Sequence, residues 1–178
     1  MNNAFDRVTA RHTHLGSCHR GTTISGSNRH GVFDNAGIHA DLATVWAALG
    51  DPQNWVKWMD DLTDVKPEDG TTAPGPGARY SASQAWWRFD NQRLTIHDYR
   101  PNERLTYSAE TTGGAVTFEY TLRQVDERRV AVHFLLRMDS TFAKVNASMS
   151  GPLLEKKLNA EAAQLRDYCE AQTSTRTA

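Results

Sequence analysis

Residues 38–55 have the sequence IHADLATVWAALGDPQNW, and this stretch contains two helix starts in quick succession. Asp41 stands at an N-cap position, and the apolar residues after it recur at the spacing of one helix face. These residues are Leu42, Val45, Trp46 and Leu49. Asp51-Pro52 then begins a second helix after Gly50, with proline at the first helical position, where its missing N–H is harmless. The stretch therefore predicts two short helices that directly follow one another.

After a proline- and glycine-rich loop at residues 66–77, the apolar pattern changes to a period of two, which is typical of β-strands. Short polar links divide this part of the chain into five predicted strands. They cover residues 78–89, 92–99, 104–110, 115–125 and 129–139. Links this short predict an antiparallel meander. Residues 32–39 and 62–65 predict two further short strands.

A long helix is predicted from Phe142 to about Gln172, interrupted at Gly151-Pro152. Bulky or apolar residues form a stripe along its second half: Leu154, Leu158, Ala162, Leu165 and Cys169. Continued towards the N-terminus, the same stripe carries only small residues: Gly151, Ala147 and Ala143. Because small residues opposite a concave sheet leave volume unfilled, we expect a cavity there, and a fully packed interior is the alternative.

This order of elements predicts an α+β fold in which a curved sheet wraps around the C-terminal helix. With 178 residues, one core is expected. We assign that domain to residues 30–172. Residues 1–29 lack apolar periodicity and are expected to form an extended or mobile arm, and residues 173–178 a C-terminal tail.

Composition narrows the classes of partner. The net charge of -1 argues against a nucleic-acid-binding protein, and the longest apolar run, Val45 to Leu49, is too short to span a membrane. Two cysteines far apart in sequence predict neither disulfides nor a thiolate zinc site, and we expect a cytoplasmic protein. The Arg-, Ser- and Thr-rich start leaves a transit peptide as an alternative. His12, His14, Cys18 and His19 have metal-ligand chemistry, but a His-rich tail explains them better, and we expect no metal or cofactor.

The opening stretch with Trp58, the later Pro101, Arg104-Leu105 and Tyr107, and the Gly113-Gly114 turn resemble the SRPBCC superfamily. This superfamily includes the START-related polyketide cyclase/dehydrase and lipid-transport proteins. The resemblance covers residues 30–172 and implies a helix-grip fold with a deep, largely apolar cavity between sheet and C-terminal helix. These motifs are mainly structural, so they specify the fold better than a reaction.

Strand alternation selects the side chains that face this interior. The predicted catalytic residues are Arg88, Tyr107 and Tyr120, because two phenols and a guanidinium could orient a polyketone or stabilise an enolate. Ordinary core packing is the alternative for each tyrosine, and an outward arginine for Arg88. Asp98 shares the parity of Leu94 and Ile96 and is expected to face inward, whereas His97, Tyr99 and His133 are expected on the convex face. The predicted ligand-binding residues are Tyr80, Gln84, Trp86, Asp98, Phe118, Phe134, Met138, Ala143, Ala147 and Gly151.

These observations predict a protein that binds a hydrophobic, aromatic or polyketide-like small molecule and promotes its cyclisation or dehydration. A non-catalytic lipid or hydrophobic-ligand carrier or sensor is the first alternative, and a START-like protein-interaction domain is the second. The sequence leaves the ligand, the reaction and a homodimeric state open.

Overall fold

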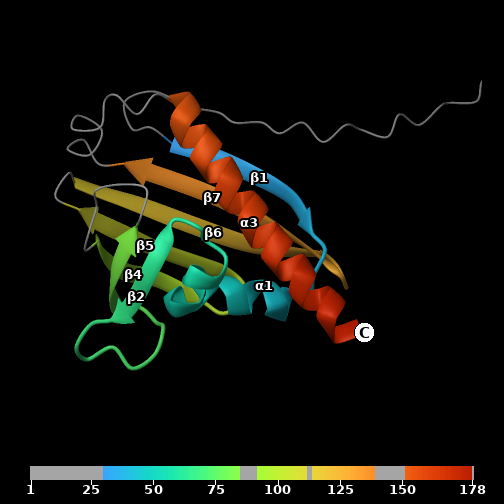
Figure 1. The fold of residues 1–178 in the computed structure, drawn as a ribbon, viewed down its shortest axis with the longest axis horizontal. Helices are drawn as coiled ribbons and strands as arrows, with labels where there is room; N and C mark the ends of the chain where they lie inside the picture. Colours follow the sequence, from blue (N-terminus) through green and yellow to red (C-terminus); the bar gives the residue numbers. More distant parts are fainter. Residues whose placement is uncertain (1–29, 85–91, 112–113, 139–150, 178) are drawn as a thin grey trace, which may run out of the picture.

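The computed structural model describes residues 30–84, 92–111, 114–138 and 151–177. Within these ranges the chain forms a seven-stranded antiparallel sheet in the order β1-β7-β6-β5-β4-β3-β2 (Figure 1). The strands are β1 (His30–Ile38), β2 (Leu62–Pro67), β3 (Arg79–Gln84), β4 (Gln92–Arg100), β5 (Arg104–Thr111), β6 (Gly114–Asp126) and β7 (Arg129–Met138). The helices are α1 (Leu42–Leu49), the 3-10 helix η1 (Pro52–Lys57) and α3 (Gly151–Thr177). The predicted α+β, helix-grip architecture is confirmed.

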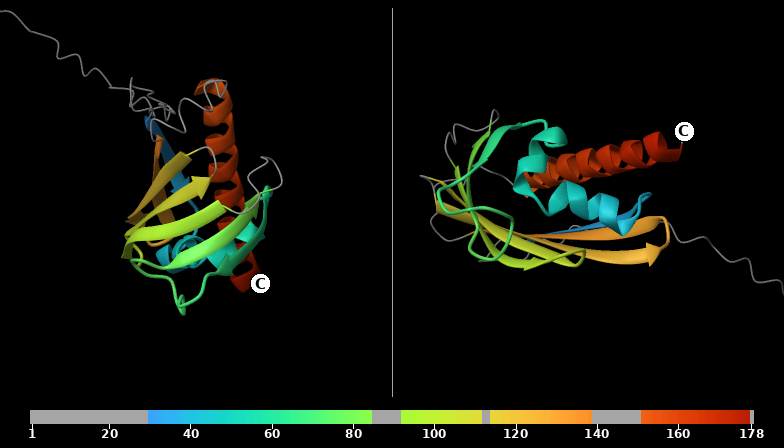
Figure 2. Two further views of the ribbon diagram at one scale, coloured as in Figure 1. Left: turned by 90° about the vertical axis from the view of Figure 1, so that its left-hand side faces the viewer. Right: turned by 90° about the horizontal axis from the view of Figure 1, so that it is seen from below.

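The three helices of the described residues lie on the same side of the sheet (Figure 2). The sheet is curved, and α3 runs diagonally across its concave face, while α1 and η1 close one end of the layer (Figures 1 and 2). The apolar interior therefore lies between the concave face and α3. None of the helices in the described residues is long and apolar enough to cross a membrane.

Both predicted helix starts are capped as the sequence indicates. The side chain of Asp41 accepts a hydrogen bond from the Thr44 backbone N–H at 2.7 Å, and that of Asp51 accepts one from the Gln53 N–H at 3.0 Å. The second helix, however, is a six-residue 3-10 helix. Two indoles hold it against α1: Trp55 Nε1 donates to the Leu49 carbonyl at 2.8 Å, and Trp58 Nε1 donates to the Ala48 carbonyl at 3.0 Å. These bonds satisfy carbonyls at the end of α1 that have no partner within the helix.

The predicted apolar stripe of α3 faces the sheet. Leu158 and Ala162 are buried, and Leu165 and Cys169 are completely buried. The helix continues beyond Gln172 to Thr177, through part of the predicted C-terminal tail. The side chain of Leu154 and residues 139–150, with Ala143 and Ala147, lie outside the described part, as do the N-terminal arm and its histidines.

Strand β1 bends at a bulge that depends on a glycine. The register with β7 shifts between Asn35 and Ile38, and Gly37 lies there with a positive φ of 85°. A Cβ at this position would lie 2.9 Å from Cδ of Arg129. Both the backbone angle and the close approach favour glycine here. The bulge precedes the turn from the sheet edge into α1.

Candidate functional site

Two buried tyrosines on neighbouring strands bring their hydroxyls together in the interior. Tyr107 of β5 and Tyr120 of β6 are 4% and 1% exposed, and their hydroxyl oxygens lie 3.4 Å apart. Their rings are stacked, with centroids 6.0 Å apart and planes 10° apart. Tyr107 pairs across the sheet with Phe118, and Tyr120 pairs with Leu105. Residues directly opposite each other on neighbouring strands lie on the same face of the sheet. Both phenols therefore lie on the concave face, which α3 covers.

Other aromatic rings surround the two phenols. Phe118 stacks on Tyr107 with centroids 5.0 Å apart, and Trp55 of η1 lies against the same tyrosine at 4.7 Å. Phe134 of β7 meets Tyr120 edge-on at 4.4 Å. The hydroxyls are therefore polar groups in an aromatic environment, which is a common composition for a small-molecule site.

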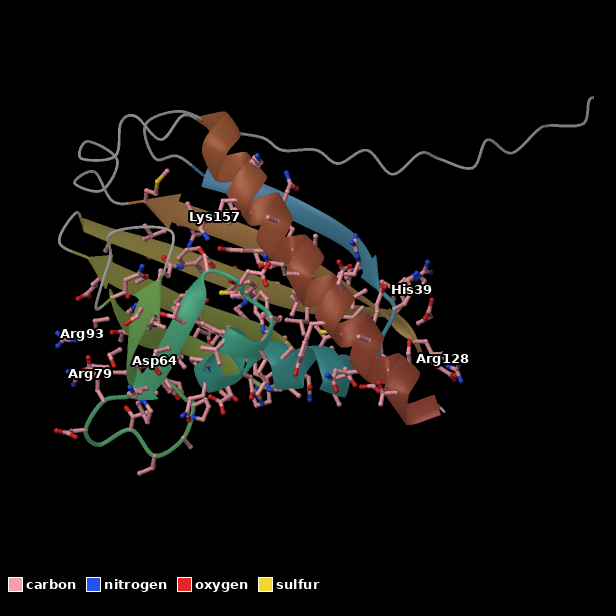
Figure 3. The ribbon with its side chains drawn as sticks, viewed as in Figure 1. His39, Asp64, Arg79, Arg93, Arg128 and Lys157 are labelled. Carbon is pink, nitrogen blue, oxygen red and sulfur yellow. The ribbon has the colours of Figure 1, made fainter. Side chains whose placement is uncertain are left out.

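Helix α3 adds a buried charged group to this interior. Lys157 Nζ lies 2.7 Å from Oε1 of Glu161, one helical turn further on, and 2.6 Å from Oδ2 of Asp61 in the turn before β2. Glu161 is only 5% exposed, and about a fifth of each of the Lys157 and Asp61 side chains is exposed. Figure 3 shows Lys157 on α3 over the sheet, far from the arginines Arg79 and Arg93 at the β2–β4 side. We call Asp61, Lys157 and Glu161 the charged triad.

Burial sets the protonation of these groups. Burial, followed by the negative charge of Glu161, raises the pKa of Tyr120, and burial with the nearby Tyr120, Glu161 and Asp61 raises that of Tyr107. Burial also raises the pKa of Glu161, although Lys157 opposes this shift. For Lys157, burial disfavours the charge, but Glu161 and Asp61 outweigh it and the pKa is raised. The phenols therefore stay neutral near pH 7, as hydrogen-bonding groups, and Lys157 stays cationic.

The structure brings only some of the predicted site residues together. A chain of ring contacts runs from Phe118 through Tyr107 and Tyr120 to Phe134. Tyr80 of β3 and Met138 at the end of β7 are buried, and Gly151 begins α3. Gln84 is half-buried, and its Oε1 accepts a hydrogen bond from Nε2 of the buried Gln92 at 2.7 Å. Trp86, Arg88, Ala143 and Ala147 lie outside the described residues, so their roles stay predictions.

The inward orientation predicted for Asp98 is wrong. The register between β4 and β5 shifts after Ile96, which faces Tyr107, so that Asp98 pairs with Thr106 and Tyr99 pairs with the buried Leu105. The bulge reverses the alternation because it inserts one extra residue into the strand. Asp98 therefore lies on the outer face, where Oδ1 is 3.3 Å from Nε of Arg100. Tyr99, expected on the convex face, instead packs against Trp46, with centroids 5.3 Å apart.

The charged triad was absent from the sequence prediction, although a signal for Glu161 exists. Position 161 is three residues after Leu158 and four before Leu165, so it falls on the apolar face of the helix. A glutamate on such a face, with a lysine one turn earlier, suggests a buried ion pair. Nothing in the sequence pairs Lys157 with Asp61, which precedes it by 96 residues. Among the described residues, no group of three His, Cys, Asp or Glu side chains could hold a metal ion.

Solved structures share this architecture at low sequence identity. The Zhui aromatase/cyclase from a Streptomyces species is 14% identical, with a TM-score of 0.62 over 83% of this chain and 96% of that one. A hypothetical protein from Helicobacter pylori is 14% identical, with a TM-score of 0.63 over 79% of this chain and 86% of that one. Ara h 8.0201 is 13% identical, with a TM-score of 0.55 over 80% and 99% of the two chains. These similarities establish the fold.

A search of curated protein sequences gives no match for the chain. A family model does match, over residues 32–170, which include every strand and helix described above except the ends of β1 and α3. The resemblance to the SRPBCC superfamily noted in the sequence is thereby confirmed. The chain belongs to the polyketide cyclase / dehydrase and lipid transport family.

Proposed function

We propose that this protein binds an aromatic or polyketide-like hydrophobic molecule between the sheet and α3 and promotes its cyclisation or dehydration. The observation that carries the proposal is the pair of buried hydroxyls of Tyr107 and Tyr120, 3.4 Å apart among aromatic rings. Family membership supports a hydrophobic ligand, and the similarity to an aromatase/cyclase supports the fold required for it.

The two phenols act on the ligand as hydrogen-bond donors. With pKa values raised by burial, neither gives up its proton easily, so neither is a good general acid or base. Within the pair one hydroxyl donates to the other, so the second keeps its O–H for a ketone oxygen that gains negative charge as an enolate forms. In a surrounding of low polarity such a bond counts for more than in water. The phenols thus stabilise the charge that an aldol closure creates.

The aromatic walls supply the second contribution, which is the shape of the bound chain. A linear polyketone has many conformations, and ring closure requires the reacting carbons to meet. The rings of Phe118, Phe134 and Trp55 present flat apolar surfaces around the phenols. They favour a folded chain whose oxygens are near the two hydroxyls. Arg88 stays a predicted partner for an enolate.

The experiment measures binding and turnover separately. Binding is followed by tryptophan fluorescence on titration with β-naphthol, and turnover by mass spectrometry of a linear poly-β-ketone offered as its N-acetylcysteamine thioester. The expected result is saturable binding together with loss of water from the thioester faster than without protein. The Tyr107→Phe/Tyr120→Phe double variant should bind the naphthol and lose most of the turnover.

Tyr168→Phe is the matched control, because Tyr168 is a half-buried tyrosine of α3 outside the phenol pair, and it should keep full turnover. Binding without any acceleration by the wild type would contradict catalysis and leave a carrier. Absence of binding would contradict the proposal as a whole.

A further inference from the structure

One oxygen of the buried Glu161 carboxylate has no partner in the described part of the chain. Oε1 is bound by Lys157 Nζ at 2.7 Å, whereas Oε2 is fully buried and lacks any hydrogen bond there. Buried polar atoms are rarely left unpaired, because such an atom loses its water without gaining a replacement. An unpaired carboxylate oxygen is the least favourable case, since the charge is concentrated on its oxygens. This oxygen requires an explanation.

The neighbouring polar groups are engaged elsewhere. Lys157 binds Asp61 as well as Oε1 of Glu161, and the hydroxyls of Tyr107 and Tyr120 face each other. Neither hydroxyl forms a hydrogen bond with Oε2. The negative charge of Glu161 contributes to the raised pKa of both tyrosines. Because such an effect weakens with distance, the carboxylate is near the phenol pair. Oε2 is thus a free acceptor beside the proposed ligand site.

We propose that Oε2 of Glu161 accepts a hydrogen bond from the ligand, so that the site selects molecules with a phenol or enol hydroxyl over the corresponding ethers and carboxylates. This inference rests on the proposed function, because it assumes that an aromatic ligand enters between the sheet and α3. A hydroxyl on that ligand reaches an acceptor that no described residue of the protein uses. Glu161 is then the residue that determines specificity.

The charge of the triad supports the same selection. Asp61 and Glu161 carry two negative charges against the one positive charge of Lys157 when all three are ionised. A carboxylate ligand would add a third negative charge to a poorly hydrated place. A hydroxyl adds none and donates the proton that Oε2 lacks. We therefore expect naphthoates to bind weakly even though their ring is the same.

The test compares ligands that share one ring system. β-Naphthol, β-methoxynaphthalene and β-naphthoate are titrated by calorimetry into the full-length protein at mildly alkaline pH, which favours the ionised form of Glu161 because its pKa is raised. The naphthol should bind about 10- to 100-fold more tightly than the ether, the factor expected of one hydrogen bond to a charged acceptor. The naphthoate should bind more weakly than the naphthol.

Glu161→Gln tests the residue assignment. The amide oxygen can keep the bond from Lys157, which leaves the amide N–H group where Oε2 was, a donor in place of an acceptor. The variant should therefore lose the preference for the naphthol and bind the ether at least as tightly as it binds the naphthol. Glu103→Gln is the control, because Glu103 is an exposed residue paired with Arg100, and its variant should keep the wild-type ratio.

A measurement on the wild-type protein tests the same residue assignment without relying on a variant that could fail to fold. With glutamate carboxyl carbons labelled with carbon-13, β-naphthol should shift the resonance of one buried glutamate, and β-methoxynaphthalene should leave it in place. Equal affinities for naphthol and ether, an unchanged ratio in Glu161→Gln, or no selective shift would overturn the inference and leave the proposed function standing. Failure of every naphthalene to bind would overturn both.

Discussion

Lys157 of α3 lies 2.6 Å from the carboxylate of Asp61, in the turn that leads into β2. The bond joins the C-terminal helix to the strand at the far edge of the sheet order. Glu161 binds the same ammonium at 2.7 Å, so one lysine pairs with two carboxylates from distant parts of the sequence. The charged triad therefore fixes α3 over the concave face next to the tyrosine pair.

Removal of the lysine charge should destabilise the fold. Lys157→Met leaves Asp61 and Glu161 without their shared cation, and the expected loss in the free energy of unfolding is about 2 kcal/mol, less than for a fully buried pair. Lys66→Met is the control, because Lys66 pairs with Asp64 on the exposed surface, and its loss should be below about 0.5 kcal/mol. Urea denaturation measures both. Equal effects of the two substitutions would show that the triad adds nothing to stability.

The raised pKa of Glu161 predicts a pH-dependent stability difference. The folded protein holds the Glu161 proton more tightly than the unfolded chain, whose glutamates titrate near pH 4.3. Stability from this group is therefore fully present below that pH and is lost as pH rises through the raised value. Glu161→Gln lacks this loss, so its free energy of unfolding should increase relative to the wild type across that window and level off above it.

The comparison uses urea denaturation at a series of pH values, with the exposed Glu103→Gln as the control. If the difference in the free energy of unfolding between Glu161→Gln and the wild type stayed constant with pH, the pKa of Glu161 would not be raised by folding. A difference that fell with rising pH would reverse the predicted sign.

Each phenol should contribute to turnover more than to binding. Tyr107→Phe and Tyr120→Phe each remove one hydroxyl from the interior and keep the ring contacts. We expect kcat on the poly-β-ketone thioester to fall about 10- to 1000-fold, the scale of one lost electrostatic contribution, with KM nearly unchanged. Steady-state kinetics beside Tyr168→Phe provide the measurement. A rise in KM at constant kcat would instead assign the hydroxyls to ground-state binding.

The contact between helix and sheet should depend on the apolar stripe of α3. Leu165 is completely buried, and Leu165→Ala removes side-chain volume that its neighbours cannot fully replace. The expected loss is about 2–5 kcal/mol in the free energy of unfolding. Val125→Ala, at a position that is 41% exposed, should change it by less than about 0.5 kcal/mol. Similar unfolding midpoints for the two variants would mean that α3 is not docked as described.

Local patterns were enough to predict the fold. The caps at Asp41 and Asp51 act within three residues, and the stripe from Leu158 to Cys169 follows from helical spacing alone. The inward orientation of Tyr107 and Tyr120 follows from alternation in strands that run without a bulge at that point. Each of these features depends on neighbours in sequence, and so the sequence contains it.

The incorrect and missing parts of the site depend on contacts between distant residues. The bulge after Ile96 reverses the faces of Asp98 and Tyr99, and no glycine or proline in that segment marks it. Lys157 meets Asp61 only because the sheet curves around α3. A charged residue on an apolar helix face can be noticed in sequence, but its partner cannot be assigned without the fold.

The most direct test of the central claim is the location of the bound aromatic ligand. Nuclear Overhauser effects between β-naphthol and protein with labelled aromatic side chains report which rings lie next to it. We expect contacts from the naphthalene protons to four rings of the concave face: Tyr107, Phe118, Tyr120 and Phe134. Contacts confined to outer-face residues such as His97, with none to these four rings, would contradict it.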